Sequence, residues 1–153
     1  MAISAPRLYK MLDGTPPVIA QWPEAASQTF VAGDFVYRVS GYATVCADDP
    51  QIIGGLALEA AHNTTAGLYS VDVLVVTGMT CLCMNTHGVN PLDTVQAADH
   101  GKTWQIEKVS TVWAINKDVA TSPSIKIIGF IDALGTVNGK VEVVVIPTVR
   151  ELA

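Results

Sequence analysis

The chain has 153 residues and a formal net charge of −5, with 50% hydrophobic and only 15% charged residues. This length fits one domain with a sizeable core, and the mean hydropathy of +0.37 predicts that apolar surface is buried between subunits. Nine scattered Lys and Arg residues exclude a basic patch for nucleic acid, and apolar runs of only strand length exclude a membrane-spanning helix.

The first 27 residues combine four prolines with large apolar side chains. The prolines rule out a long helix or a central strand, because proline lacks a backbone N–H and fixes φ. A disordered tail would be poor in aromatic and aliphatic residues. We therefore predict an extended N-terminal arm over residues 1–27 that docks on another molecule. Its candidate contact residues are Tyr9, Met11, Pro16, Pro17, Val18, Ile19 and Trp22.

Trp22 is the strongest predicted anchor of this arm. Nothing near it in the sequence belongs to a domain that could bury the indole, and aromatic anchors dominate the energetics of interfaces. We expect Trp22 to fill a pocket on a partner rather than one in its own chain. The arm would order on binding, by adding a short strand between Pro6 and Pro16 to a sheet edge.

Residues 28–153 read as a series of short strands separated by turns. Tight turns are predicted at Gly33-Asp34, at Thr77-Gly78 and at Asn138-Gly139. The last two are predicted to be hairpin turns, and Asn-Gly is the stronger signal. About nine strands at this spacing predict an all-β barrel or sandwich. No internal repeat is evident. One short helix is expected over residues 90–100, because Asn90 can cap it, Pro91 can open it and Gly101 can end it.

Three cysteines leave at least one unpaired, which favours a reducing compartment, and the N-terminus does not resemble a secretory signal. Synthesis in a cytoplasm is therefore expected. Cys81 and Cys83 share one face of a predicted strand at a separation that disfavours a disulfide. A zinc site made of this pair and His87, with Asp93 or His100, has no standard spacing. We therefore interpret the thiols as buried and free.

Enzymatic chemistry finds little support in the sequence. Cys46, His62 and Asp48 could form a nucleophilic site only if the fold brought them together. Other acidic residues do not follow the alternating pattern of a calcium loop. These scattered acidic residues are Asp48, Asp49, Asp93 and Asp99. We predict a protein that is not an enzyme and that needs neither a cofactor nor a metal.

Three stretches, residues 30–61, 98–118 and 127–147, resemble the small decoration (cement) proteins of tailed-bacteriophage capsids, in particular those built on a compact β-barrel. The matching features are structural rather than catalytic. They are a Gly-turn strand at Gly33, the Ile53-Gly54 strand, the Gly101-Lys102 turn and the closing hairpin from Asp132 to Val141.

This resemblance implies a homotrimer outside the mature head that bridges neighbouring major capsid subunits, with no nucleic-acid or membrane partner. Residues 28–153 would form the decoration domain, and residues 1–27 the arm that contacts the capsid. Two other classes stay open. An adhesion or receptor-binding module would need repeats or an aromatic cluster that binds carbohydrate. A small β-barrel ligand carrier or enzyme would need a cavity with convergent polar groups.

Overall fold

The computed structural model describes residues 2–151, and these residues confirm the predicted all-β class. Strands with apolar residues at every second position, such as Lys140–Val145, bury one face and leave the other partly exposed. The eleven strands are β1 (Arg7–Met11), β2 (Ile19–Pro23), β3 (Phe35–Val39), β4 (Tyr42–Val45), β5 (Gly55–Ala57), β6 (Ser70–Val75), β7 (Thr80–His87), β8 (Thr103–Val109), β9 (Val112–Asn116), β10 (Ile125–Phe130) and β11 (Lys140–Val145). Two single-turn 3₁₀ helices, η1 (Ala97–Asp99) and η2 (Pro147–Val149), complete the elements.

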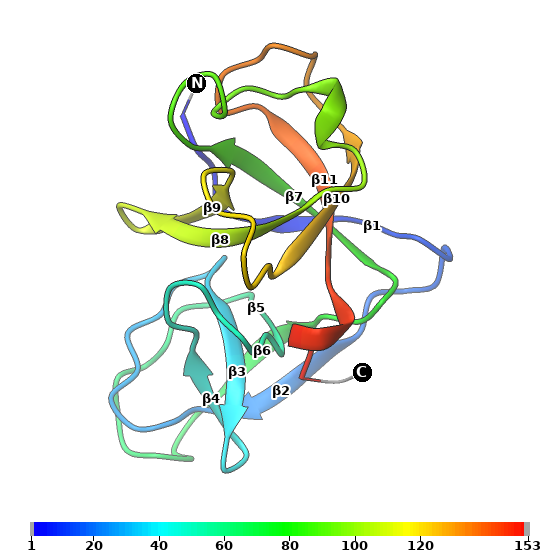
Figure 1. The fold of residues 1–153 in the computed structure, drawn as a ribbon. Coiled ribbons are helices and arrows are strands. Elements are labelled where there is room, and N and C mark those ends of the chain that lie inside the picture. The colour runs from blue at the N-terminus through cyan, green and yellow to red at the C-terminus, as the bar shows by residue number, and fades with distance from the viewer. Residues whose placement is uncertain (1, 152–153) are drawn as a thin grey trace.

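The strands form two bodies that lie one above the other (Figure 1). The lower one, which we call the N-terminal sheet, has the strand order β2-β6-β5-β3-β4. The upper one, the C-terminal barrel, has the order β7-β11-β10-β8-β9 and is closed by a parallel pairing of β9 with β7. In the N-terminal sheet the outer strands meet at one parallel bridge, between Glu24 and Ala43.

The two bodies have the same topology. If the five strands of each are numbered in chain order, both follow the order 1-5-4-2-3, and in both the third strand meets the first in parallel. The fold thus repeats one strand order although no internal repeat is evident in the sequence. Weak sequence traces agree, since Ser70–Val75 reads SVDVLV and Lys140–Val145 reads KVEVVV. The hairpin between the second and third strands of each body also turns at a serine with positive φ, Ser40 at 51° between β3 and β4 and Ser110 at 60° between β8 and β9.

The boundary between the two bodies falls at residues 76–79. A hairpin was predicted around Thr77-Gly78, and this prediction is wrong, because β6 pairs with β2 and β5 whereas β7 pairs with β1, β11 and β9. The turn is real, with the Thr80 N–H donating to the Thr77 carbonyl, but it connects two bodies instead of two paired strands.

The predicted N-terminal arm is part of both bodies. Strand β1 pairs antiparallel with β7 of the C-terminal barrel, and β2 is an outer strand of the N-terminal sheet. The connector of residues 12–18 between them projects from the right-hand side in Figure 1. The C-terminal segment leaves the C-terminal barrel and contacts the N-terminal body. There Arg150 forms a bridge with Ile53, and the Glu151 N–H donates to the Ile53 carbonyl.

A continuous apolar core joins the two bodies. Phe35 and Leu56 of the N-terminal sheet belong to the same buried cluster as Trp113 and Ile115 of the C-terminal barrel. A second, smaller cluster fills the N-terminal sheet itself. Its buried members are Trp22, Phe30, Val36, Ala43, Ala57, Val71, Val73 and Val75.

The helix expected over residues 90–100 shrinks to the single turn η1. Its first half bonds across to the loop of residues 131–139 instead. The Asn138 N–H donates to the Asp93 carbonyl, and the Val95 N–H donates to the Thr136 carbonyl. A tertiary partner therefore takes backbone groups that a helix would need, and this overrides the local capping signal.

Candidate functional site

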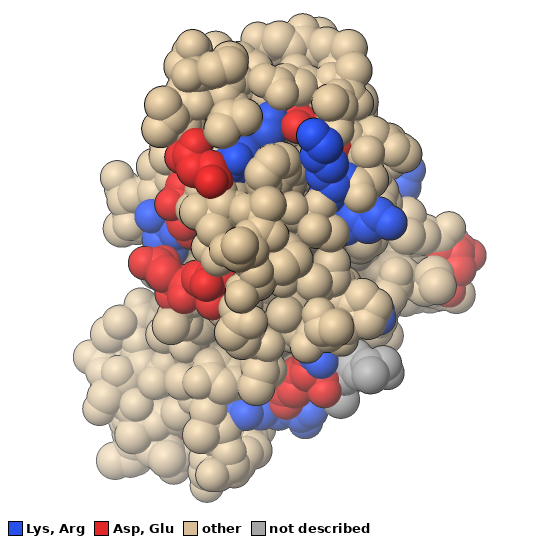
Figure 2. Space-filling view, in the orientation of Figure 1, with Lys and Arg blue, Asp and Glu red and all other residues tan. Residues whose placement is uncertain are grey.

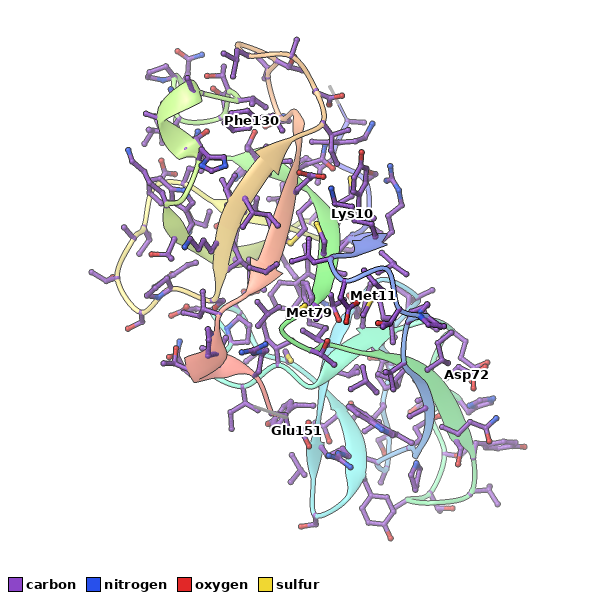
Figure 3. The ribbon with its side chains drawn as sticks, turned by 90° about the vertical axis from the view of Figure 1, so that its right-hand side faces the viewer. Lys10, Met11, Asp72, Met79, Phe130 and Glu151 are labelled. Carbon is purple, nitrogen blue, oxygen red and sulfur yellow. The ribbon has the colours of Figure 1, made fainter. Side chains whose placement is uncertain are left out.

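Several residues of the predicted arm are exposed. Tyr9 on β1 is 47% exposed, and Val18 and Ile19 at the start of β2 are 49% and 57% exposed. Pro16 and Pro17 are exposed in the connector, while Met11 is half-buried at the end of β1. Figure 3 labels Met11 of this group, next to Met79, and the Leu12 N–H that follows Met11 donates to the Met79 carbonyl.

Trp22 does not belong to that exposed surface. Only 5% of the residue is exposed, because it sits inside the N-terminal sheet opposite Val71 of β6. The Arg38 guanidinium lies 4.8 Å from the indole centroid, a cation–π contact. The prediction that Trp22 needs a pocket on another molecule is wrong, because β6, some fifty residues further along the chain, completes its pocket.

Strand β1 is held on the barrel by polar as well as backbone contacts. Lys10 Nζ lies 2.9 Å from Glu142 Oε1 of β11, and this hydrogen bond and the nearby charge raise the pKa of Lys10. The Ser4 N–H and hydroxyl both donate to Asn85 Oδ1 at 3.1 Å. A strand was predicted to add to a sheet edge between Pro6 and Pro16, and β1 adds to an edge of its own chain.

Charge is distributed unevenly over the surface. Figure 2 shows acidic and basic side chains across the middle of the face in view and in a further cluster below the centre, with uncharged surface at the top and at the lower left. The two ends carry the connection between the fourth and fifth strands of each body. Each connection holds a single charged residue near its start, Glu59 in one and Asp132 in the other, and residues 60–71 and 133–139 contain no Asp, Glu, Lys or Arg. Leu68 at one end and Leu134 at the other are 62% and 58% exposed.

The lower end also carries aromatic side chains. The rings of His62 and Tyr69 stack with centroids 4.2 Å apart and planes 10° apart. His62 Nδ1 lies 2.8 Å from the buried carboxylate of Glu24, which also accepts hydrogen bonds from the backbone N–H groups of His62 and Asn63. Glu24 thus fixes the loop that presents the aromatic pair, which the sequence alone did not reveal.

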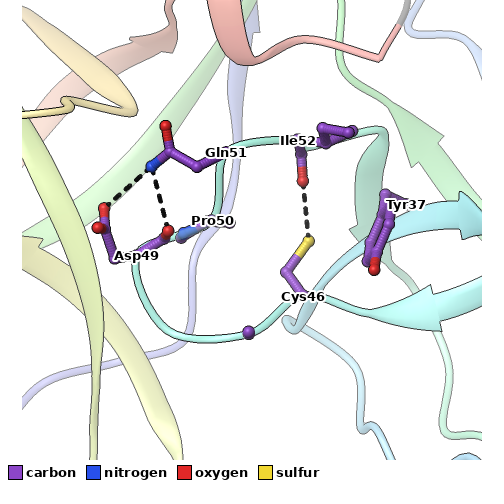
Figure 4. Close-up of a pocket in the computed structure, with 7 residues that line it drawn as sticks. Tyr37, Cys46, Asp49, Pro50, Gln51 and Ile52 are labelled. Atoms are coloured by element: carbon purple, nitrogen blue, oxygen red, sulfur yellow. Dashed lines mark hydrogen bonds between the residues drawn. The ribbon is translucent and has the colours of Figure 1, made fainter.

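Two shallow pockets lie near the junction of the bodies. One of about 280 Å³ is lined by Tyr37, Cys46 and the loop of residues 47–52 (Figure 4). Its polar groups bond to one another, since Gln51 Nε2 donates to Asp49 and Cys46 Sγ donates to the Ile52 carbonyl. The second, of about 320 Å³, lies between the N-terminal segment and the N-terminal sheet. Neither gathers the convergent polar groups of a catalytic or cofactor site.

All three cysteines are buried and free, as predicted. Burial raises the pKa of Cys46 to about 12 and that of Cys81 to about 11, and it also raises the pKa of Cys83. A protonated thiol is a poor nucleophile and a poor metal ligand. Within residues 2–151, no three His, Cys, Asp or Glu side chains are arranged to hold a metal ion.

The other candidate chemical residues are engaged elsewhere. His87 Nδ1 lies 2.7 Å from Glu107 Oε1, so the ring is directed to β8. In the hypothetical nucleophilic set, Cys46 bonds to Ile52, His62 bonds to Glu24, and Asp48 accepts from the Lys108 N–H. The fold does not assemble these residues into one site.

No family model, curated protein or solved structure matches the chain. No helix in the described residues is long and apolar enough to cross a membrane. The most prominent surface feature of the described chain is thus its exposed apolar side chains.

Proposed function

We propose that this protein is a structural decoration protein of a tailed-phage capsid, without enzymatic activity. It binds the outside of the assembled head and bridges neighbouring major capsid subunits. The observation that carries this proposal is the pair of charge-poor ends, one on each of two bodies with the same topology. A bridging protein needs two like surfaces that face different neighbours, and exposed apolar patches mark such surfaces.

The flank formed by Tyr9, Val18 and Ile19 adds a third contact in this proposal. Each contact can be weak, because several contacts on one particle bind together with high effective concentration. A homotrimer would multiply them again. Binding only to the assembled lattice stabilises that lattice by mass action. The net charge of −5 gives the protein no reason to bind the genome, and the proposal needs no cofactor.

Co-sedimentation with purified, DNA-filled heads tests the proposal. The wild-type chain should pellet with heads, and Leu68→Asp and Leu134→Asp should each weaken binding at least tenfold, because each places a charge in an apolar contact. Ile52→Asp is the matched control, since Ile52 is 49% exposed but lies in the loop between β4 and β5, outside both ends. Absence of wild-type protein from the pellet would refute the proposed function.

One observation favours a second candidate, an adhesion module that binds glycans. The stacked pair of His62 and Tyr69 offers a flat aromatic face at an exposed loop. In this case Tyr69→Ala would abolish binding to an immobilised glycan panel. A panel with no bound glycan would remove this candidate.

A further inference from the structure

The shared topology makes the two first strands, β2 and β7, directly comparable. Gln21 of β2 is opposite Asp72 of β6, and Cys83 of β7 is opposite Glu142 of β11. A second pair of hydrogen bonds gives the same correspondence. The Glu24 N–H donates to the Tyr69 carbonyl, and the Thr86 N–H donates to the Gly139 carbonyl. Residues 18–21 of β2 therefore correspond to residues 80–83 of β7.

On β7, this segment carries an added strand. Residues 80–83 pair with β1, and the end of β7 pairs with β9. On β2, the same side is paired only at its C-terminal end, where Glu24 forms a parallel bridge with Ala43. The edge of residues 19–22 pairs with no strand in the described chain, because β2 stands at the end of the sheet order. One of two equivalent edges is filled, and the other is open.

The open edge presents free backbone groups. The Val18 carbonyl accepts from the Val75 N–H, and the Glu24 N–H donates to the Tyr69 carbonyl. Because antiparallel bonding alternates, residues 18, 20, 22 and 24 bond to β6, while residues 19, 21 and 23 point their backbone groups away from it. Pro23 occupies one outward position, where its missing N–H breaks no bond to β6.

Beside each of the two edges, the neighbouring strand carries an acidic side chain at the equivalent position. Glu142, beside the filled edge, is paired with Lys10 of β1 at 2.9 Å. Asp72 occupies the equivalent position beside the open edge, and among residues 2–151 no cation lies within ion-pair distance of it. Figure 3 shows Lys10 over the barrel and Asp72 on the lower body of the same flank.

We propose that the free edge of β2 is a strand-addition site for an extended, lysine- or arginine-containing segment of a partner protein. The segment would pair with residues 18–21 as β1 pairs with β7, and its cation would reach Asp72 as Lys10 reaches Glu142. The identity of the partner as a capsid subunit rests on the proposed function. The exposed Val18 and Ile19 side chains would be covered by the added strand.

A second copy of this chain is a poorer occupant. Each chain has one β1 and two such edges, so moving β1 to the β2 edge of a neighbour would empty the β7 edge and form no additional pairing. Pairing β2 with β2 of another copy would bring no cation, because the sequence IAQWP has none. Asp72 would then stay unpaired.

A synthetic peptide with the sequence of residues 4–13, SAPRLYKMLD, is the probe. Added at up to about 1 mM to the ¹⁵N-labelled full chain, the peptide should shift the amide resonances of residues 18–21, and these shifts should reach a plateau. Asp72→Lys should weaken the affinity for the peptide at least tenfold, and a peptide with Lys10→Glu should restore binding to that variant. Shifts confined to residues 80–83, or no shift at all, would overturn the proposal.

Gln21→Pro blocks the edge selectively, because the Gln21 N–H points away from β6. Gln21→Ala is its matched control, and the melting temperature of both verifies folding. Peptide binding should be lost in Gln21→Pro and kept in Gln21→Ala. Equal binding by both variants would refute the edge site, and light scattering that finds a dimer sensitive to Gln21→Pro would show a second copy as the occupant and refute the partner.

Co-sedimentation with heads separates this inference from the proposed function. If wild-type protein does not bind heads but the peptide shifts residues 18–21, the capsid function fails and the edge site stands. If wild-type and Gln21→Pro proteins bind heads equally and the peptide has no effect, the edge site fails and the capsid function stands.

Discussion

The carboxylate of Asp34, in the N-terminal sheet, accepts a hydrogen bond from Nε1 of Trp113, in the C-terminal barrel, at 3.2 Å. The same oxygen lies 3.3 Å from Lys108 Nζ, and the other accepts from the Val31 N–H at 3.0 Å. The indole also meets the ring of Phe35 edge-on, with centroids 5.5 Å apart. The two bodies are thus joined by a buried polar contact within their shared core.

Asp34→Ala should destabilise the chain by about 3 kcal/mol, because it leaves the buried Trp113 N–H and the Val31 N–H without an acceptor. Urea unfolding followed by tryptophan fluorescence and by circular dichroism measures this. The two signals should coincide, since one core joins both bodies. Asp13→Ala, in the exposed connector, is the control and should change stability by less than about 0.5 kcal/mol. Two separate transitions in the wild type would contradict the shared core.

Trp22→Ala should cost about 3 to 5 kcal/mol of stability, because it empties the interior of the N-terminal sheet. Ile19→Ala, on the same strand but 57% exposed, should cost far less. Thermal melts of the free proteins distinguish the two. For the same reason, deleting residues 1–27 should unfold the N-terminal sheet rather than remove a dispensable arm, and an unchanged melt of the truncated chain would refute this view.

Lys117→Met should destabilise by about 3 to 5 kcal/mol, because a buried carboxylate would lose its cation. Lys117 Nζ lies 2.7 Å from Asp99 Oδ2 and donates to the Thr94 carbonyl, and both charged residues are 1% exposed. The double variant with Asp99→Leu should be less destabilised than the sum of the single variants. Additive effects in denaturant unfolding would show that the pair is not coupled.

The three thiols should resist a disulfide reagent at pH 8 in the folded chain and react at once in denaturant. Burial raises the folded pKa of Cys46 to about 12 from an ordinary value of 9.0. A raised acid pKa means that the folded state holds its proton where the unfolded state loses it. Stability is therefore complete below pH 9 and falls as the pH rises from 9 toward 12. Cys46→Ala should reduce this loss, and rapid labelling of the native protein would contradict the burial.

The alternation of apolar residues along β6 and β11 was enough to predict the fold class. Strands β10 and β11 pair as predicted, but they are joined by residues 131–139 rather than by a tight turn at Asn138-Gly139, because Val137 bridges to Thr94 instead. The place of Trp22 could not be predicted in the same way. Strand β2 has five residues, ends in Pro23 and pairs with a strand near residue 71, so nothing local in the sequence marks it. Long-range pairing, rather than local propensity, decides an edge strand of this kind.

The candidate site was predicted only in part. Tyr9, Val18 and Ile19 are exposed, but the open edge depends on which backbone groups point away from β6, and no side-chain pattern encodes that direction. The duplicated topology was equally hidden, because the two bodies share strand order while most of their side chains differ. Asp72 is recognised as part of the site only because Glu142, at the equivalent position, forms an ion pair with Lys10.

The crossing of the two chain ends makes the molecule indivisible despite its doubled architecture. The first strand belongs to the later body, and the last residues return to the earlier one through Ile53. A cut at residues 76–79 would therefore give two fragments that each lack a piece held by the other. Producing either body alone would therefore expose the edge or loop that the exchanged chain end covers in the whole molecule.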